Sequence, residues 1–408
     1  MKVLHVVPYM HPRAGGPVVV VDRLCRKLTA KGWDTPVITT DCFARDEPLE
    51  TWDFDARPYP LDVHPVRRFP FGGSYAASPA LTDDLERVAP TCDLVHVHTL
   101  WTHATAAAIR IARRRHVPFV VMPHGMLDPH SMSRKPFKKK LYGTAVEFPR
   151  LRHAAGMVYT TAGEQRLAES TVPSLPSGHI VTLGTDDPPD VKRSDAAAAF
   201  RSAYPHLADR RLVIHLGRIH PKKGLDILVP AFASVARQVP DAHLLLVGPD
   251  QDNYLDVIRG LASSRGISDR VTHIPMLTGD RKWQALAAAS VFALPSYQEN
   301  FGIAVAEAAR MSLPLVISNR VNLWPDVQDT GAGIVTECNV KQVADAMTTL
   351  LTDDAASRQA GDAARNLART RYTWDRSAEA LTTLYEQVLH QTEEHPMTAI
   401  SPTRAWTT

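Results

Sequence analysis

Two glutamates and a predicted helix start follow one apolar segment, Val291–Leu294, which has the composition of a buried strand. Glu299 falls in the loop after this segment, and Phe301–Ile303 should open a helix whose first N–H groups lack backbone partners and can bind phosphate. Glu307 lies in that apolar helix, where a carboxylate costs free energy unless it is hydrogen-bonded. Ribose or other sugar hydroxyls would satisfy it. An exposed helix glutamate is the alternative.

Two cations follow a second apolar segment, Leu212–Leu216. Arg218 and Lys223 come after its C-terminal end, in the sequence GRIHPKKG. A guanidinium binds a diphosphate as a flat fork of donors, and an ammonium binds it as a point charge. The pattern therefore predicts an anion site. A pair of solvated surface cations is the alternative.

Two weaker signals lie in the first half of the chain. Gly15 and Gly16 precede a helix expected from Val18, and paired glycines before a helix let an anion approach the backbone closely. A simple turn explains them equally well. His124 follows the apolar segment Phe119–Met122 and could donate a hydrogen bond to a ligand oxygen, but a packed or surface histidine fits the same position.

Composition excludes several classes of site. The net charge of +3 argues against a dedicated nucleic-acid binder. Asp53 and Asp55 form an Asp-x-Asp pattern of the kind that binds metal in some sugar-transferring enzymes, but no apolar strand precedes it, so we expect a solvated loop and no metal site. The cysteines form no C-x-x-C pair and are expected to be free thiols in a reducing compartment: Cys25, Cys42, Cys92 and Cys338.

Basic residues cluster in two runs, Arg110–Arg115 and Arg134–Lys140. Such runs are typical of solvated helix faces, and the alternative is a patch that meets an anionic membrane surface or a pyrophosphate-linked acceptor. The N-terminus has no apolar signal segment, and no stretch approaches the roughly 18 apolar residues of a membrane span. These observations predict a cytoplasmic protein, or one peripheral on the inner face of the membrane.

Short apolar segments alternate with helical stretches along the whole chain, which predicts an α/β protein with two doubly wound, Rossmann-like parallel sheets. The predicted strands are Val3–Val7, Val37–Thr39, Leu94–Val97, Phe119–Met122, Met157–Thr160, Leu212–Leu216, His243–Val247, Val271–Ile274, Val291–Leu294 and Pro314–Ile317. The predicted parts are an N-terminal domain at 1–185, a Pro-rich linker at 186–195, a C-terminal domain at 196–372, a last helix at 373–390 and a disordered tail at 391–408.

Taken together and in order, these segments resemble the retaining, GT-B-fold glycosyltransferases of family four, also called group 1. The matching motifs are GGP at 15–17, VHVHTLW at 95–101, PHGML at 123–127, GRIHPKKGLDIL at 217–228, PSYQENFGIAVAEA at 295–308, GAGIV at 331–335 and RYTWD at 371–375. The two glutamates with seven residues between them are the hallmark of that family.

The resemblance implies two domains facing across a cleft and a nucleoside-diphosphate sugar as donor, with no cofactor and no metal. It implies that Arg218 and Lys223 hold the donor diphosphate, that Glu307 binds the ribose, and that Glu299 and His124 act at the transferred sugar. It further implies that the backbone of Asn300, Phe301, Gly302 and Ile303 binds the sugar and phosphate of the donor. Gly15 and Gly16 would let the N-terminal domain close over the phosphates.

The expected reaction is transfer of a hexosyl group, with retention, to a saccharide or lipid-linked acceptor in polysaccharide or glycoconjugate assembly. The alternatives are an epimerase of the same fold and a non-catalytic sugar-nucleotide binder. A nicotinamide-dependent oxidoreductase is disfavoured, because the G-x-G-x-x-G fingerprint is missing.

Overall fold

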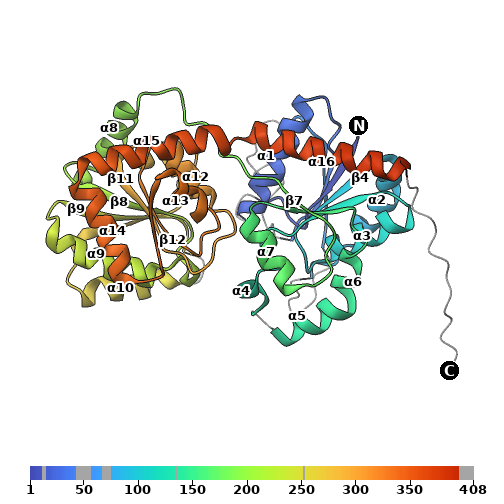
Figure 1. The fold of residues 1–408 in the computed structure, drawn as a ribbon, viewed down its shortest axis with the longest axis horizontal. Coiled ribbons are helices and arrows are strands. Elements are labelled where there is room, and N and C mark those ends of the chain that lie inside the picture. The colour runs from blue at the N-terminus through green and yellow to red at the C-terminus, as the bar shows by residue number, and fades with distance from the viewer. Residues whose placement is uncertain (12–14, 43–56, 67–74, 134–135, 251–252, 395–408) are drawn as a thin grey trace. The chain divides into compact units, whose positions relative to one another are not determined.

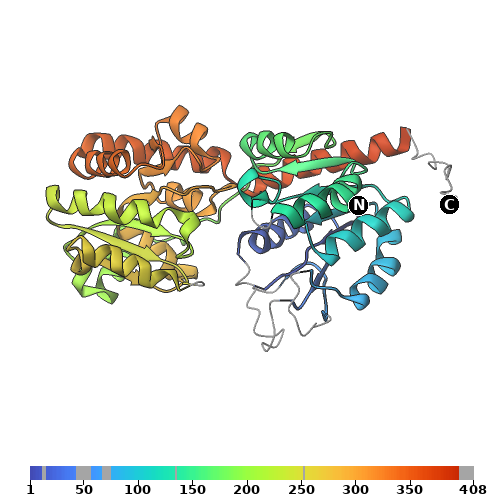
Figure 2. The same ribbon diagram turned by 90° about the horizontal axis from the view of Figure 1, so that it is seen from below.

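A computed structural model describes residues 1–11, 15–42, 57–66, 75–133, 136–250 and 253–394 of the chain (Figure 1). The chain divides into two compact units. The first contains Met1–Val181 together with the C-terminal stretch from Ser377, and the second contains Thr182–Arg376. Each unit has its own parallel sheet between layers of helices (Figure 2). The predicted α/β class with two Rossmann-like sheets is therefore confirmed.

The first unit contains a seven-stranded parallel sheet in the order β3-β2-β1-β4-β5-β6-β7. Its strands are β1 (Val3–Val6), β2 (Val37–Thr40), β3 (Leu61–His64), β4 (Leu94–His98), β5 (Phe119–Met122), β6 (Gly156–Tyr159) and β7 (Gly178–Ile180). The chain runs outward from β1 to β3 and then returns to place β4 on the other side of β1. The strand order therefore reverses between β1 and β4, the type of position where doubly wound sheets bind ligands.

Helices cover both faces of this sheet. They are α1 (Gly16–Ala30), α2 (Pro79–Val88), α3 (His103–Arg114), α4 (Pro129–Met132), α5 (Pro136–Tyr142), α6 (Phe148–Leu151), α7 (Ala162–Thr171) and, for most of its length, α16 (Trp374–Glu394). α16 ends at Glu394 rather than at the predicted His390. The four extra residues include no helix breaker, and the Thr392 hydroxyl donates a hydrogen bond to the Val388 carbonyl oxygen.

The second unit contains a six-stranded parallel sheet in the order β10-β9-β8-β11-β12-β13, and its order reverses between β8 and β11. The strands are β8 (Arg211–Leu216), β9 (Ala242–Val247), β10 (Val271–Ile274), β11 (Ala289–Leu294), β12 (Leu315–Ser318) and β13 (Gly333–Thr336). The helices are α8 (Arg193–Ala203), α9 (Leu225–Gln238), α10 (Tyr254–Ser264), α11 (Gly279–Ala288), α12 (Ile303–Arg310), α13 (Trp324–Thr330), α14 (Val340–Thr352) and α15 (Asp354–Arg371). Residues 186–195, predicted as a linker, belong to this unit.

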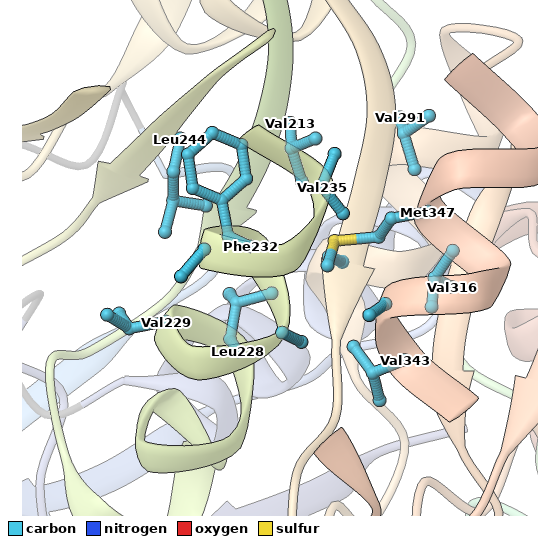
Figure 3. Close-up of a cluster of buried hydrophobic side chains, with 14 of the residues drawn as sticks. Val213, Leu228, Val229, Phe232, Val235, Leu244, Val291, Val316, Val343 and Met347 are labelled. Carbon is cyan, nitrogen blue, oxygen red and sulfur yellow. The ribbon is translucent and has the colours of Figure 1, made fainter. Parts of the chain in front are cut away.

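A continuous apolar core fixes one face of the second sheet. Phe232 of α9 and Met347 of α14 point toward Val213, Leu244 and Val291 of three neighbouring strands (Figure 3). All five side chains are fully buried. Burial of such side chains contributes about 1.5–3 kcal/mol each. This packing makes the sheet a rigid base for the loops that leave its C-terminal edge.

Candidate functional site

Two loops of the second unit meet at the point where its strand order reverses. The loop after β8 passes through a short 3-10 helix, Pro221–Lys223, to Gly224, which starts α9 in the left-handed conformation with φ 68°. A Cβ added at Gly224 would lie 2.0 Å from the carbonyl oxygen of Pro295, in the loop after β11. The Tyr297 N–H also donates to the Lys222 carbonyl oxygen at 3.0 Å. Backbone contacts therefore hold the two loops together.

The predicted cation Lys223 and the predicted carboxylate Glu299 form an ion pair across these loops. Their side chains are only 15% and 18% exposed, so Lys223 is not a solvated surface cation. Burial raises the pKa of the Glu299 carboxyl, but the charges of Lys223, Lys222 and Arg218 outweigh it and hold the pKa below its ordinary value. Glu299 is therefore an anion surrounded by cations, of which Arg218 is exposed to solvent.

The segment after Glu299 forms the start of α12. Phe301 is 3% exposed and packs edge-on against Tyr372, with ring centroids 5.5 Å apart, so its side chain anchors the loop in the core. Gly302 takes the N-cap position with φ 85°, and no side chain of the described residues caps the helix. The N–H groups at Ile303 and Ala304 therefore remain available to an anion, as the sequence predicted for a phosphate-binding helix start.

Glu307 is buried in α12, so the alternative of an exposed helix glutamate is wrong. Its partner is Lys282 of α11, whose Nζ lies 2.5 Å from Oε1 of Glu307 and 4.8 Å from the centroid of the Trp283 ring. Burial raises the pKa of the Glu307 carboxyl, and Lys282 opposes the rise without cancelling it. The sequence indicated that this carboxylate needs a partner, but it did not identify Lys282.

The predicted residues of the first unit lie in the loops after β1 and β5. Gly15, with φ 91°, precedes α1, and a Cβ added at Gly15 or Gly16 would meet no described atom within 4 Å. His124 follows β5 in the left-handed conformation, with φ 52°. The next N–H, of Gly125, donates to the buried carboxylate of Glu164 at 2.5 Å, which fixes this turn. Burial lowers the pKa of His124 to about 3, so its imidazole is neutral at pH 7.

Comparison with known proteins decides the family. Residues 198–367 match the family described as "Glycosyl transferases group 1", and residues 15–185 match the "Glycosyl transferase 4-like domain". The chain belongs to the group 1 glycosyltransferases. The two Rossmann-like units are those of the GT-B fold. The resemblance noted in the sequence motifs is thus confirmed for both halves of the chain.

Individual group 1 relatives are distant. The D-inositol 3-phosphate glycosyltransferase of Mycobacteroides abscessus is 32% identical over 49% of this chain and 44% of its own length, so this match spans about half of the relative. The enzyme of the same name from Nocardia farcinica is 28% identical over 95% of this chain and 88% of its own length. HepE from Anabaena, solved with UDP and glucose, has a TM-score of 0.74 at 19% identity, covering 95% of this chain and 100% of HepE.

This group 1 member also has buried histidines at the C-terminal ends of its strands that sequence reasoning passed over. His215 of β8 directs Nδ1 toward the Ala293 carbonyl oxygen at 3.3 Å, and burial lowers its pKa to about 3. His98 of β4 lies beside His124, with 3.1 Å between Nδ1 of His98 and Nε2 of His124. A histidine within an apolar strand is the signal that could have identified both residues.

Several sequence predictions concern residues without a described position. Asp53 and Asp55 lie outside the described residues, and so do Arg134 and Lys135 of the second basic run. Among the residues that are described, one group could hold a metal ion, formed by the three buried histidines His5, His96 and His98. No helix in the described ranges is long and apolar enough to cross a membrane. The four cysteines are free.

Proposed function

We propose that the protein is a retaining glycosyltransferase that transfers a hexosyl group from a nucleoside-diphosphate sugar to a saccharide or lipid-linked acceptor. The observation that carries this proposal is the arrangement of Arg218, Lys223 and Glu299 beside the uncapped start of α12. Cations and free N–H groups at one sheet edge suit a diphosphate, and a neighbouring carboxylate suits sugar hydroxyls. The UDP bound to HepE supports the same class of donor.

In this proposal the cations stabilise the leaving group. Lys223 pairs with Glu299, so a bound diphosphate would share the lysine with the carboxylate. Arg218 is exposed and can turn toward a second phosphate oxygen. When the bond from the sugar to the diphosphate breaks, negative charge grows on the leaving oxygen, and fixed cations and N–H groups stabilise it without reorganisation. This chemistry needs no metal.

The remaining predicted residues take separate roles. Glu307 accepts hydrogen bonds from the ribose, and Glu299 accepts them from the transferred sugar. His124, neutral at pH 7, donates a hydrogen bond to an oxygen of that sugar. Retention of configuration follows if the leaving phosphate oxygen deprotonates the acceptor on the face that it leaves.

Donor binding provides the first test. We expect UDP, GDP or ADP to bind measurably in calorimetry. Arg218→Ala and Lys223→Ala should each weaken that binding roughly 10- to 100-fold, because a charged hydrogen bond contributes about 1.5–3 kcal/mol. Lys341→Ala removes an exposed cation from α14 and is the matched control, with unchanged affinity expected. Unchanged affinity in both site variants would contradict the assignment.

Product analysis provides the second test. Incubation with UDP-, GDP- and ADP-sugars and candidate acceptors should give a glycoside with the anomeric configuration of the donor. Transfer should persist in EDTA. Inversion, or loss of transfer in EDTA that manganese or magnesium restores, would contradict the retaining or the metal-free part of the proposal. Epimerised donor without transfer would identify the epimerase alternative instead.

A membrane-bound acceptor would require contact with a lipid surface, and α5 is suited to it. Phe137 is 79% exposed and Leu141 is 64% exposed, and their spacing of four residues places them on one helix face. Lys140 beside them is exposed. Apolar side chains combined with cations favour an anionic leaflet. We therefore include weak, salt-sensitive membrane association in the proposed function.

A further inference from the structure

The first unit contains a row of histidines on one face of its sheet, where the strand order reverses. His5 of β1 pairs in register with His96 of β4, and His98 lies two residues further along β4. Side chains alternate along a strand, so the three imidazoles share one face, whereas Leu4 and Val95 contribute to the apolar core on the other. All three histidines are fully buried. Such a concentration of polar groups inside a sheet costs free energy unless they are paired.

The pairing forms a chain of hydrogen bonds. Nδ1 of His5 lies 3.0 Å from Nε2 of His98, and Nδ1 of His98 lies 3.1 Å from Nε2 of His124. His96, which lies opposite His5 on β4, has a separate partner: its Nδ1 lies 2.6 Å from the hydroxyl of Tyr385. Tyr385 belongs to α16, which lies along the first unit (Figure 1). Within the described part of the chain, Nε2 of His5 and Nε2 of His96 have no hydrogen-bond partner.

We propose that His5 and His98 are positioning residues that fix the tautomer of His124, so that its only ring proton lies on Nδ1 and points away from the chain as a hydrogen-bond donor. The proposal deepens the proposed function, because it rests on His124 acting at the transferred sugar. It also assigns Tyr385 as the group that sets the direction of the chain.

The chain permits two proton arrangements. A neutral imidazole has one donor and one acceptor nitrogen. If the proton of His98 is on Nδ1, His98 donates to His124 and accepts from His5, which places the proton of His124 on Nδ1. If the proton of His98 is on Nε2, every bond reverses, and His124 carries its proton on Nε2. In the second arrangement, Nε2 of His5 is a buried N–H without a partner among the described residues.

Tyr385 favours the first arrangement. Among the described residues its buried hydroxyl has one partner, Nδ1 of His96, so the hydroxyl proton is paired if Tyr385 donates and unpaired if it accepts. Donation to Nδ1 forces the proton of His96 onto Nε2. The His5 and His96 rings lie 5.2 Å apart at their centroids, a candidate ligand nitrogen of each lies within 4.8 Å of the other, and neither Nε2 has a hydrogen-bond partner among the described residues. An N–H on His96 beside a lone pair on His5 is attractive, whereas two N–H groups repel. His5 therefore carries its proton on Nδ1, as the first arrangement requires.

The protonation states agree with this logic. Burial lowers the pKa of His5 to about 3 and lowers the pKa values of His96 and His98 well below their ordinary range, so all three are neutral at pH 7. Burial also raises the pKa of Tyr385 well above its ordinary value, so the hydroxyl keeps its proton. A divalent metal is the competing occupant of the cluster, because three histidines are a known ligand set for zinc, and the Zn²⁺ measurement given below decides between the two.

The direct test is the tautomer of His124, read from the nitrogen shifts of uniformly ¹⁵N-histidine-labelled full-length protein and assigned with His124→Asn. We expect the Nδ1–H tautomer in the unmodified protein and a mixture, or mainly Nε2–H, in His98→Leu and Tyr385→Phe. His98→Asn places an amide donor near the former Nδ1 and should restore the Nδ1–H form. His243→Leu removes a buried strand histidine of the other unit, which pairs with Thr272, and should leave the His124 signal unchanged.

The kinetic test separates the tautomer from the function. In His98→Leu, turnover should fall by up to the roughly 100- to 1,000-fold that loss of one preorganised donor costs, with the affinity for free nucleoside diphosphate unchanged. If the unmodified protein turns over no donor, the proposed function fails. The nitrogen shifts still test the histidine hydrogen bonds in that case. If His98→Leu does not fold, His98→Asn and Tyr385→Phe carry the comparison. A Nε2–H signal in the unmodified protein, or stoichiometric Zn²⁺ binding that His5→Leu abolishes, would overturn the proposal.

Discussion

Replacing Lys282 with methionine leaves the buried carboxylate of Glu307 without its partner. At 2.5 Å the two charges attract by about 7 kcal/mol at an effective dielectric constant of about 20, before desolvation is subtracted. Loss of one partner from a fully buried pair costs about 3–5 kcal/mol. The Lys282 and Glu307 side chains are 19% and 12% exposed, so we expect a smaller loss than for a fully buried pair, about 2–3 kcal/mol at pH 7. Methionine can pack an apolar side chain on Trp283, but it loses the contact of the ammonium with that ring.

The pH dependence of this loss has a definite sign. Burial already raises the pKa of Glu307, and removal of Lys282 raises it further. A raised carboxyl pKa means that the folded protein binds the proton more tightly, so the penalty is small below the ordinary value of 4.5 and grows as the pH rises through the folded pKa. Urea unfolding at pH 4.5 and pH 7.5, fitted with separate transitions for the two units, measures the difference.

The double variant Lys282→Met with Glu307→Gln is the control. Because it removes both charges, it should be more stable than Lys282→Met alone at pH 7.5 and should lose the pH dependence. A loss below about 0.5 kcal/mol in Lys282→Met, or an equal loss at both pH values, would refute the reasoning that Glu307 is a buried anion held by this lysine.

Three further outcomes are expected. Glu299→Gln should lower turnover more than nucleoside-diphosphate affinity, whereas Glu307→Gln should weaken both, as calorimetry beside transfer kinetics would show; the reverse pattern would exchange their roles. Gly224→Ala should cost about 2–4 kcal/mol of unfolding free energy, because strain at positive φ adds to a backbone clash. Gly331→Ala is the matched control, because Gly331 has φ 69° and no described atom lies within 4 Å of the new Cβ. It should cost only about 1–2 kcal/mol of unfolding free energy, and an equal cost for Gly224→Ala would exclude the clash with the Pro295 carbonyl. Flotation with anionic liposomes at low salt should decrease in Phe137→Asp, and flotation that neither salt nor this change affects would count against the proposed membrane contact.

The fold was predictable where strands are buried on both faces. The segments named from the sequence coincide with every inner strand of both sheets, such as β8 and β9, because burial on both faces demands continuous apolar runs. They also include one edge strand, β10. The missed strands, β3, β7 and β13, all lie at sheet edges. In β3 the sequence Leu61–His64 alternates and every residue is partly exposed or exposed, as at a sheet edge. Periodicity alone cannot distinguish such a strand from a loop.

The candidate site was predictable where chemistry follows a strand directly. Lys223 and Glu299 both follow strands that prove to be neighbours, so their pairing results from the strand order. Lys282 was missed because it comes from a helix whose position depends on tertiary packing. The histidine row was missed because His96 and His98 lie within an apolar strand and His5 is far away in sequence. Only the register of β1 against β4 brings them together.

The approach of Gly224 to the Pro295 carbonyl has a consequence for how this protein can change. Backbone contacts at Gly224 and between Tyr297 and Lys222 hold the loop with Lys223 against the loop with Glu299, beside the ion pair of Lys223 with Glu299. These backbone contacts do not depend on the identity of the surrounding side chains, so exchanges around the two loops leave them in place. Libraries that aim at a different donor should hold position 224 as glycine and vary the neighbouring side chains.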